Sequence, residues 1–146
     1  MKISNIGIVG AGTMGSGISQ VAALTDHDIV MQDVSEDATN RGIGAIDKSL
    51  QRLVDREKIT ADAKNAAIGK IRTTTDLSGL ADCDLVIEAA TENMDLKLSL
   101  FEEIAKVSRP ETIIASNTSS LSLTKLASVS SRPDKVSECT SLIQCQ

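Results

Sequence analysis

The sequence has almost no aromatic side chains, with one Phe and no Tyr or Trp. It therefore lacks the aromatic surface on which single-stranded nucleic acids stack their bases. Its formal net charge of -5 also opposes binding to a phosphate backbone. We therefore expect no nucleic acid among its partners.

Long apolar runs and metal-binding motifs are also missing. No apolar run approaches the roughly 20 residues that a membrane helix needs, and the chain begins with a strand-like segment where a signal peptide would have basic and apolar segments. Its three cysteines, Cys83, Cys139 and Cys145, form no CxxC motif and no metal-binding pattern with His. We therefore expect no metal and no membrane segment, and the odd cysteine count predicts a reducing, cytoplasmic setting.

Two kinds of apolar periodicity alternate along a chain whose 146 residues suit one globular domain. Runs rich in Ile and Val predict strands at residues 2–9, 28–32, 84–90 and 112–115, and residues 73–75 are expected to form a further short strand. Helical spacing predicts helices at residues 13–24, 36–58 and 96–107, with a further helix capped by Thr60 and a helical turn at 76–81. This alternation predicts an α/β fold of the doubly wound, Rossmann type. Its mainly parallel sheet has a helical pair inserted after the second strand.

The first strand runs directly into a glycine-rich turn. Residues 10–15 read GAGTMG and match GxGxxG in the context that the motif requires, between a strand and a helix. Gly10 permits the tight turn, Gly12 lets the backbone approach a pyrophosphate, and Gly15 lets helix and strand pack closely. The first helical turn, which includes Thr13 and Met14, supplies amide donors and a partial positive charge.

Asp33 ends the second predicted strand, 18 residues after Gly15. A carboxylate there accepts hydrogen bonds from ribose hydroxyls and repels a 2′-phosphate. The next residues, Val34 and Ser35, include no arginine that could receive such a phosphate. The pattern favours NAD over NADP. The alternative is a glycine turn that binds nothing, with Asp33 as a solvated strand end.

Three separate strings carry a resemblance to the 3-hydroxyacyl-CoA dehydrogenase family, including the 3-hydroxybutyryl-CoA dehydrogenases. They are GIVGAGTMGSGI at residues 7–18, DLVIEA at 84–89 and ASNTSSL at 115–121. The last string is the most specific, because generic dinucleotide-binding folds do not carry it. The resemblance covers residues 1–136 and implies oxidation of a short-chain L-3-hydroxyacyl-CoA to the 3-ketoacyl-CoA with NAD, in fatty-acid metabolism.

The resemblance also implies roles for residues that spacing alone would not single out. It places Glu92 and Lys97 beside the nicotinamide ribose, although by themselves they would be read as a surface ion pair. It matches Ser119 to the serine that meets the 3-oxygen of the substrate. Asn117 shapes that turn and is counted with Ser119 among the cofactor-binding residues. Composition alone would make residues 116–120 a polar loop that caps the next helix.

A further pair of residues matches positions that touch coenzyme A. Ser49 and Arg56 lie two turns apart on one face of the long predicted helix. Arg56 replaces the usual lysine of the family but keeps a positive charge for a phosphate. Without the resemblance both would be read as part of a solvated helix face.

The histidine that serves as the base in the family is missing from its expected place. His27, the only histidine, lies in a predicted turn on the wrong side of the sheet. After Val136 the family continues approximately Ile-Gly-Met-His-Phe-Phe-Asn-Pro-Val-Pro, whereas this chain reads SECTSLIQCQ. Residues 136–146 can be back-translated into one choice of synonymous codons. When that nucleotide sequence is read from the last base of the Val136 codon, in the shifted frame, it encodes the family peptide. Thr140 then stands in the place of the histidine.

We therefore expect residues 1–136 to be an incomplete NAD-binding domain and residues 137–146 to be a tail read in a shifted frame. The family's C-terminal helical domain, which forms its homodimer, would then be absent and turnover would be slight. Two alternatives stay open: a dehydrogenase of a free hydroxy acid, and a non-catalytic structural relative. Binding of acetoacetyl-CoA would distinguish an acyl-CoA dehydrogenase from a dehydrogenase of a free hydroxy acid. Hydride transfer after the frame is restored would exclude a non-catalytic structural relative.

Overall fold

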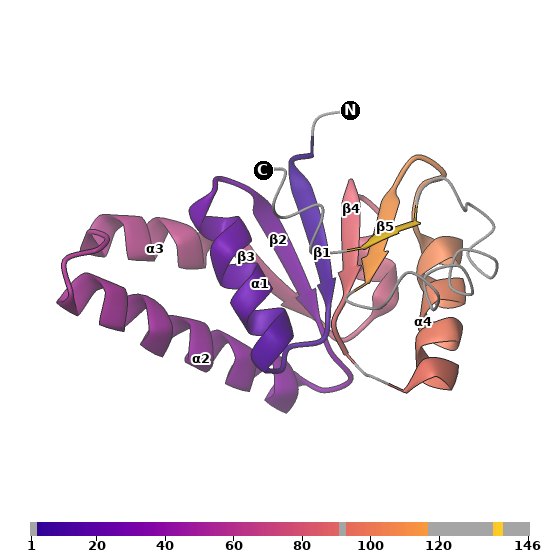
Figure 1. The fold of residues 1–146 in the computed structure, drawn as a ribbon, viewed down its shortest axis with the longest axis horizontal. Coiled ribbons are helices and arrows are strands. Elements are labelled where there is room, and N and C mark those ends of the chain that lie inside the picture. Colours follow the sequence, from indigo (N-terminus) through magenta and orange to yellow (C-terminus); the bar gives the residue numbers. More distant parts are fainter. Residues whose placement is uncertain (1–2, 91–92, 117–135, 139–146) are drawn as a thin grey trace.

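The structure is a computed structural model that describes residues 3–90, 93–116 and 136–138. A parallel sheet of six strands in the order β3-β2-β1-β4-β5-β6 forms its centre (Figure 1). The strands are β1 (Asn5–Val9), β2 (Asp28–Gln32), β3 (Ile71–Thr74), β4 (Leu85–Glu88), β5 (Ile113–Ser116) and β6 (Val136–Glu138). The chain moves from β1 to β2 on one side and later returns to β4 on the other, so the strand order reverses beside β1. Ligands of such sheets bind at this point, outside the carboxyl ends of the strands.

Helices connect the strands and cover both faces of the sheet. They are α1 (Thr13–Leu24), α2 (Glu36–Asp55), α3 (Ala61–Gly69), the short 3₁₀ helix η1 (Leu77–Leu80) and α4 (Met94–Val107). Side-chain oxygens of Ser35, Thr60 and Asn93 accept amide hydrogens at the starts of α2, α3 and α4. The α/β fold, the inserted helical pair and the Thr60 cap are confirmed. Over the described residues, no helix has both the length and the apolar character that crossing a membrane requires.

Alternate strand residues supply the two layers of the core. Ile6, Ile8 and Met31 face α1, α2 and α3, where they pack with Ile46 and Leu50 of α2. The intervening strand residues face α4 and η1, in a smaller cluster built from Val9, Val30, Leu80, Val86, Phe101 and Ile104. Because both faces are covered, the strands are continuous apolar runs, as parallel sheets require.

Element boundaries differ from the prediction by a few residues, for local reasons. β1 starts at Asn5, which is the first residue to pair with β2, and the Ser4 amide before it bonds to the Asp84 side chain. α2 ends at Asp55, three residues early, and Glu57 just beyond it adopts a left-handed φ of 59°. β3 starts at Ile71, which pairs with Ile29 of β2.

Asp84 fastens the amino-terminal end of the sheet, opposite the glycine turn. Its Oδ2 accepts the amide hydrogens of Ser4 at 2.9 Å and Asn5 at 3.0 Å, and its Oδ1 accepts from the Arg109 guanidinium at 2.6 Å. Burial by itself would raise the pKa of Asp84, but the two amides and Arg109 together hold that pKa below its usual value of 3.8. The ionised carboxylate therefore stabilises the fold.

We predict that Asp84→Asn lowers the free energy of unfolding at pH 7 by about 1–2 kcal/mol, because charge-assisted hydrogen bonds are lost. A depressed pKa stabilises the fold above the unfolded-state pKa, and that contribution is lost as the pH falls through the folded-state value. The difference between the two proteins should therefore shrink below pH 4. Urea unfolding between pH 3 and 7 measures it. Asp82→Asn, at an exposed neighbouring carboxylate, serves as the control; an equal loss in both variants would contradict the prediction.

Candidate nucleotide-binding site

The glycine turn joins β1 to α1 with almost no space to spare. Gly10 adopts φ +113° and donates its amide hydrogen to the Gln32 carbonyl at 2.7 Å. A Cβ atom at Gly10 would lie 2.9 Å from the backbone of Ala89. One at Gly15 would lie 1.8 Å from the Gly10 carbonyl oxygen, which no shift of a side chain could relieve. Gly10 and Gly15 are therefore required by the fold itself.

Gly12 differs from these two glycines because it faces open space. A Cβ atom there would meet nothing within 4 Å, and its φ of -74° suits any residue. Gly12 is the N-cap of α1 and supplies no side chain to cap the helix. The amides of the first turn, which includes Thr13 and Met14, therefore lie at an exposed helix start. This arrangement fits a phosphate that approaches the backbone closely.

Asp33 lies directly beside this turn, at the carboxyl end of β2. Its Oδ2 accepts the Ala11 amide hydrogen at 2.8 Å, and its Oδ1 accepts that of Val34 at 2.7 Å. The side chain is half-buried, and each carboxylate oxygen can accept a second hydrogen bond. Asp33 thus fixes the turn and can still accept hydrogen bonds from ribose hydroxyls, as the sequence predicts.

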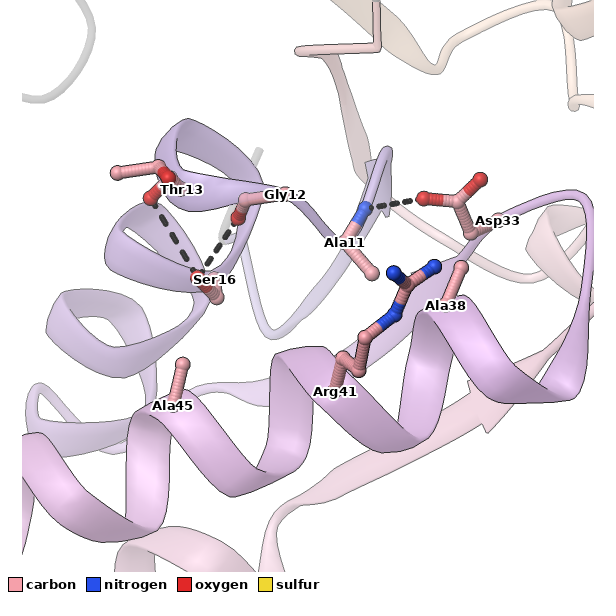
Figure 2. Close-up of a pocket in the computed structure, with 8 residues that line it drawn as sticks. All are labelled: Ala11, Gly12, Thr13, Ser16, Asp33, Ala38, Arg41 and Ala45. Carbon is pink, nitrogen blue, oxygen red and sulfur yellow. Dashed lines mark hydrogen bonds between the residues drawn. The ribbon is translucent and has the colours of Figure 1, made fainter.

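A pocket of about 380 Å³ opens between the glycine turn, Asp33 and α2 (Figure 2). Ala38, Arg41 and Ala45 of α2 line one wall, and Figure 2 shows the Arg41 guanidinium extending from the helix toward Ala11 and Asp33. Gly42 brings the helix this close, since a Cβ atom there would lie 2.8 Å from the Ala11 carbonyl oxygen.

A buried polar cluster lies at the carboxyl ends of β4 and β5. The Lys97 ammonium group donates to Glu88 Oε2 at 2.6 Å and is 3.4 Å from Ser116 Oγ. Ser116 Oγ also donates to Glu88 Oε2, at 3.3 Å. All three side chains are almost fully buried. Lys97 is therefore not a surface residue, and among the described residues its ion-pair partner is Glu88. The interpretation of Lys97 as half of a surface ion pair is wrong.

The remaining predicted site residues fall into two groups. Glu92, Asn117, Ser119 and Thr140 lie outside the described residues. Ser49 is half-buried on α2, and Arg56 is exposed directly after that helix ends.

Sequence reasoning missed two residues of this region. Arg41 follows Asp33 by eight residues, outside the adjacent positions where an arginine for a 2′-phosphate is expected. Ala38, Arg41 and Ala45, however, follow helical spacing after the Ser35 cap, which would have placed them on one face. Glu88 belongs to the predicted strand at residues 84–90, and an acidic residue inside such an apolar run needs a buried partner, which is the signal that points to it.

Fold and site together define a Rossmann-type domain that binds NAD. A family model for the NAD-binding domain of 3-hydroxyacyl-CoA dehydrogenases matches residues 5–139. The chain therefore belongs to this family.

Two relatives show how much of a dehydrogenase this chain spans. A probable 3-hydroxybutyryl-CoA dehydrogenase of Deinococcus radiodurans is 48% identical over 87% of this chain and 45% of its own length. The crystal structure of (S)-3-hydroxybutyryl-CoA dehydrogenase from Ralstonia eutropha superimposes with a TM-score of 0.89 at 46% identity, over 92% of this chain and 48% of the other. The chain thus spans about half the length of these relatives.

The glycines give a sharp test of the site. Gly15→Ala should destabilise the fold by more than about 3 kcal/mol, because the methyl group overlaps backbone that cannot move away. Gly12→Ala should change stability by less than about 1 kcal/mol, yet weaken NAD binding at least about tenfold, because its methyl group fills the space for the pyrophosphate.

Thermal unfolding and calorimetric titration with NAD measure both effects. Gly17→Ala is the matched control, since Gly17 lies in α1 with open space around its Cα. It should keep NAD affinity and slightly raise stability. Unchanged NAD affinity in Gly12→Ala would show that the dinucleotide does not approach this turn.

Proposed function

We propose that this chain is the NAD-binding part of a cytoplasmic enzyme that oxidises short-chain L-3-hydroxyacyl-CoA to 3-ketoacyl-CoA. The main support is the identity of 48% to a relative named as a probable 3-hydroxybutyryl-CoA dehydrogenase. NAD supplies the hydride-accepting nicotinamide. The chain's own residues bind and orient the two ligands. The family resemblance further suggests that the complete protein is a homodimer assembled through a C-terminal helical domain.

The buried cluster supports a role for Lys97 near the nicotinamide ribose. Glu88 and Ser116 use two of the three donors of the ammonium group. They hold it where β4 and β5 end, immediately before the segment that contains Asn117 and Ser119. A buried cation fixed in this way is positioned before any ligand arrives, so little ordering cost remains on binding. We assign Glu92 to the same ribose, and Asn117 and Ser119 to the turn that meets the 3-oxygen.

Helix α2 supports the proposed contacts with coenzyme A. Ser49 lies in α2 and Arg56 is the C-cap of that helix, seven residues further on and about 10 Å away along the helix axis. The exposed Arg56 guanidinium suits a phosphate of the coenzyme. No such contact is needed by a dehydrogenase of a free hydroxy acid.

The chain has no histidine in a position to act as the base. His27 lies in the turn before β2, where its ring nitrogen Nδ1 is 3.0 Å from Thr25 Oγ1 and 3.2 Å from the Ala22 carbonyl oxygen. It precedes a strand of five residues whose far end carries the nucleotide site, a separation of about 15 Å. We therefore propose that the chain binds both ligands but transfers hydride slowly or not at all.

We further propose that residues 137–146 are a shifted reading of the strand that carries the histidine in the family, with Thr140 in its place. The parallel pairing of β6 with β5 supports this position for the strand. The coding DNA around the Val136 codon tests the idea. A nucleotide sequence that cannot encode the family peptide in any frame would overturn it. Hydride transfer should appear when the coding frame is restored through and beyond this strand.

Ligand binding tests the substrate class. With NADH present, acetoacetyl-CoA should bind measurably in calorimetric titration and acetoacetate should not, because the coenzyme supplies most of the contacts. Arg56→Ala should weaken acetoacetyl-CoA binding about three- to tenfold, the usual worth of an exposed charge-assisted contact.

Lys106→Ala is the matched control, because it removes one exposed positive charge from α4 on the other face of the sheet. It should leave acetoacetyl-CoA affinity unchanged. Equal binding of acetoacetate and acetoacetyl-CoA would favour a dehydrogenase of free hydroxy acids.

A further inference from the structure

The pocket between α2 and the glycine turn carries two opposite charges. Asp33 and Arg41 both line it (Figure 2). Over the described part of the chain, Arg41 forms no ion pair, and its one hydrogen bond is a long contact of 3.4 Å from Nε to the Asp37 carbonyl. The terminal nitrogens of its guanidinium group therefore remain available to a ligand.

The position of this pocket identifies which part of a dinucleotide would face it. In the NAD site described above, a bound dinucleotide would have its pyrophosphate at Gly12 and the hydroxyls of its adenosine ribose facing Asp33. The pocket adjoins both Gly12 and Asp33, so it lies beside the ribose carbon that carries the 2′ substituent. The volume of about 380 Å³ exceeds what a hydroxyl group needs and can hold a phosphate.

We propose that Arg41 is a specificity-determining residue of the adenosine ribose subsite, and that Asp33 alone keeps a 2′-phosphate out of a pocket already equipped to bind it. This inference rests on the NAD site and not on the identity of the acyl-CoA substrate. Arginine is well suited to the role, because its planar guanidinium donates two parallel hydrogen bonds to phosphate oxygens. Asp33 opposes the same phosphate by charge repulsion at close range.

Charge removal at Asp33 tests the first half of the proposal. In Asp33→Asn, NADP should bind at least about tenfold more tightly than in the parent chain, while NAD binds more weakly. The asparagine side chain still offers one oxygen to the backbone amides that Asp33 now holds. Adding Arg41→Ala to Asp33→Asn should abolish the gain for NADP.

The matched control is Arg52→Ala, combined with Asp33→Asn. Arg52 lies eleven residues after Arg41 on the same helix face, about 16 Å further along the axis, and is also exposed. This double variant should keep the gain. A gain that survives Arg41→Ala would overturn the role of Arg41 and assign the phosphate to backbone amides. No gain in Asp33→Asn, with NAD still bound, would overturn the proposal altogether.

A second measurement covers the case in which Asp33→Asn does not fold. Arg41→Ala in the parent chain removes an exposed side chain and should fold normally. It should weaken NADP binding about fivefold and NAD binding less than twofold, whereas Arg52→Ala should change neither. Equal effects of Arg41→Ala on NAD and NADP would overturn the proposal. These titrations contain no acyl-CoA, so they test the role of Arg41 independently of whether the proposed enzymatic activity is correct.

Discussion

The contact between the α-carbon of Gly15 and the carbonyl oxygen of Gly10 leaves no room for a methyl group. This contact lets α1 begin directly at the end of β1, so that the helix start points at the edge where β1, β2 and β4 finish. At two glycines the backbone also approaches another segment so closely that a side chain would not fit. Gly10 passes against the Ala89 backbone after β4, and Gly42 brings α2 against Ala11. Three segments distant in sequence thus meet at one turn, and the nucleotide site is the surface that they leave open.

Charged side chains divide the sheet into a structural end and a ligand-binding end. At the amino-terminal end, Asp84 has its acceptor capacity engaged by backbone amides and Arg109. At the carboxyl end, Asp33 bonds to two amides but keeps acceptor capacity beside an open pocket. Lys97 also lies at the carboxyl end and combines both properties. It is buried, and its ammonium group has one donor beyond those used by Glu88 and Ser116. The same chemical groups thus serve stability or binding according to which end of the strand carries them.

Sequence alone predicted the helices and the first five strands in their order, the glycine turn and the position of Asp33, because each depends on local rules of periodicity and chain geometry. It did not predict β6. It did not predict the contacts of Lys97 or Arg41, because these depend on which side chains distant elements bring together. The ion pair of Lys97 joins β4 to α4 across nine positions, and no helical or strand spacing links such a pair. Ser119 and Asn117 were identified by family resemblance only, since a polar serine-rich segment has many structural uses.

Helix α2 connects the two proposed ligand sites physically. Its first half is held against the glycine turn by Gly42, which fixes the place of Arg41 beside the nucleotide pocket. Ser49 lies about 12 Å further along the axis and Arg56 directly follows the helix end. The buried residues Ile46 and Leu50 pack this stretch onto the core, so the core supports the helix along its length. A shift of α2 on nucleotide binding would therefore move the proposed coenzyme A contacts as well, because a packed helix transmits displacement along its length rather than absorbing it.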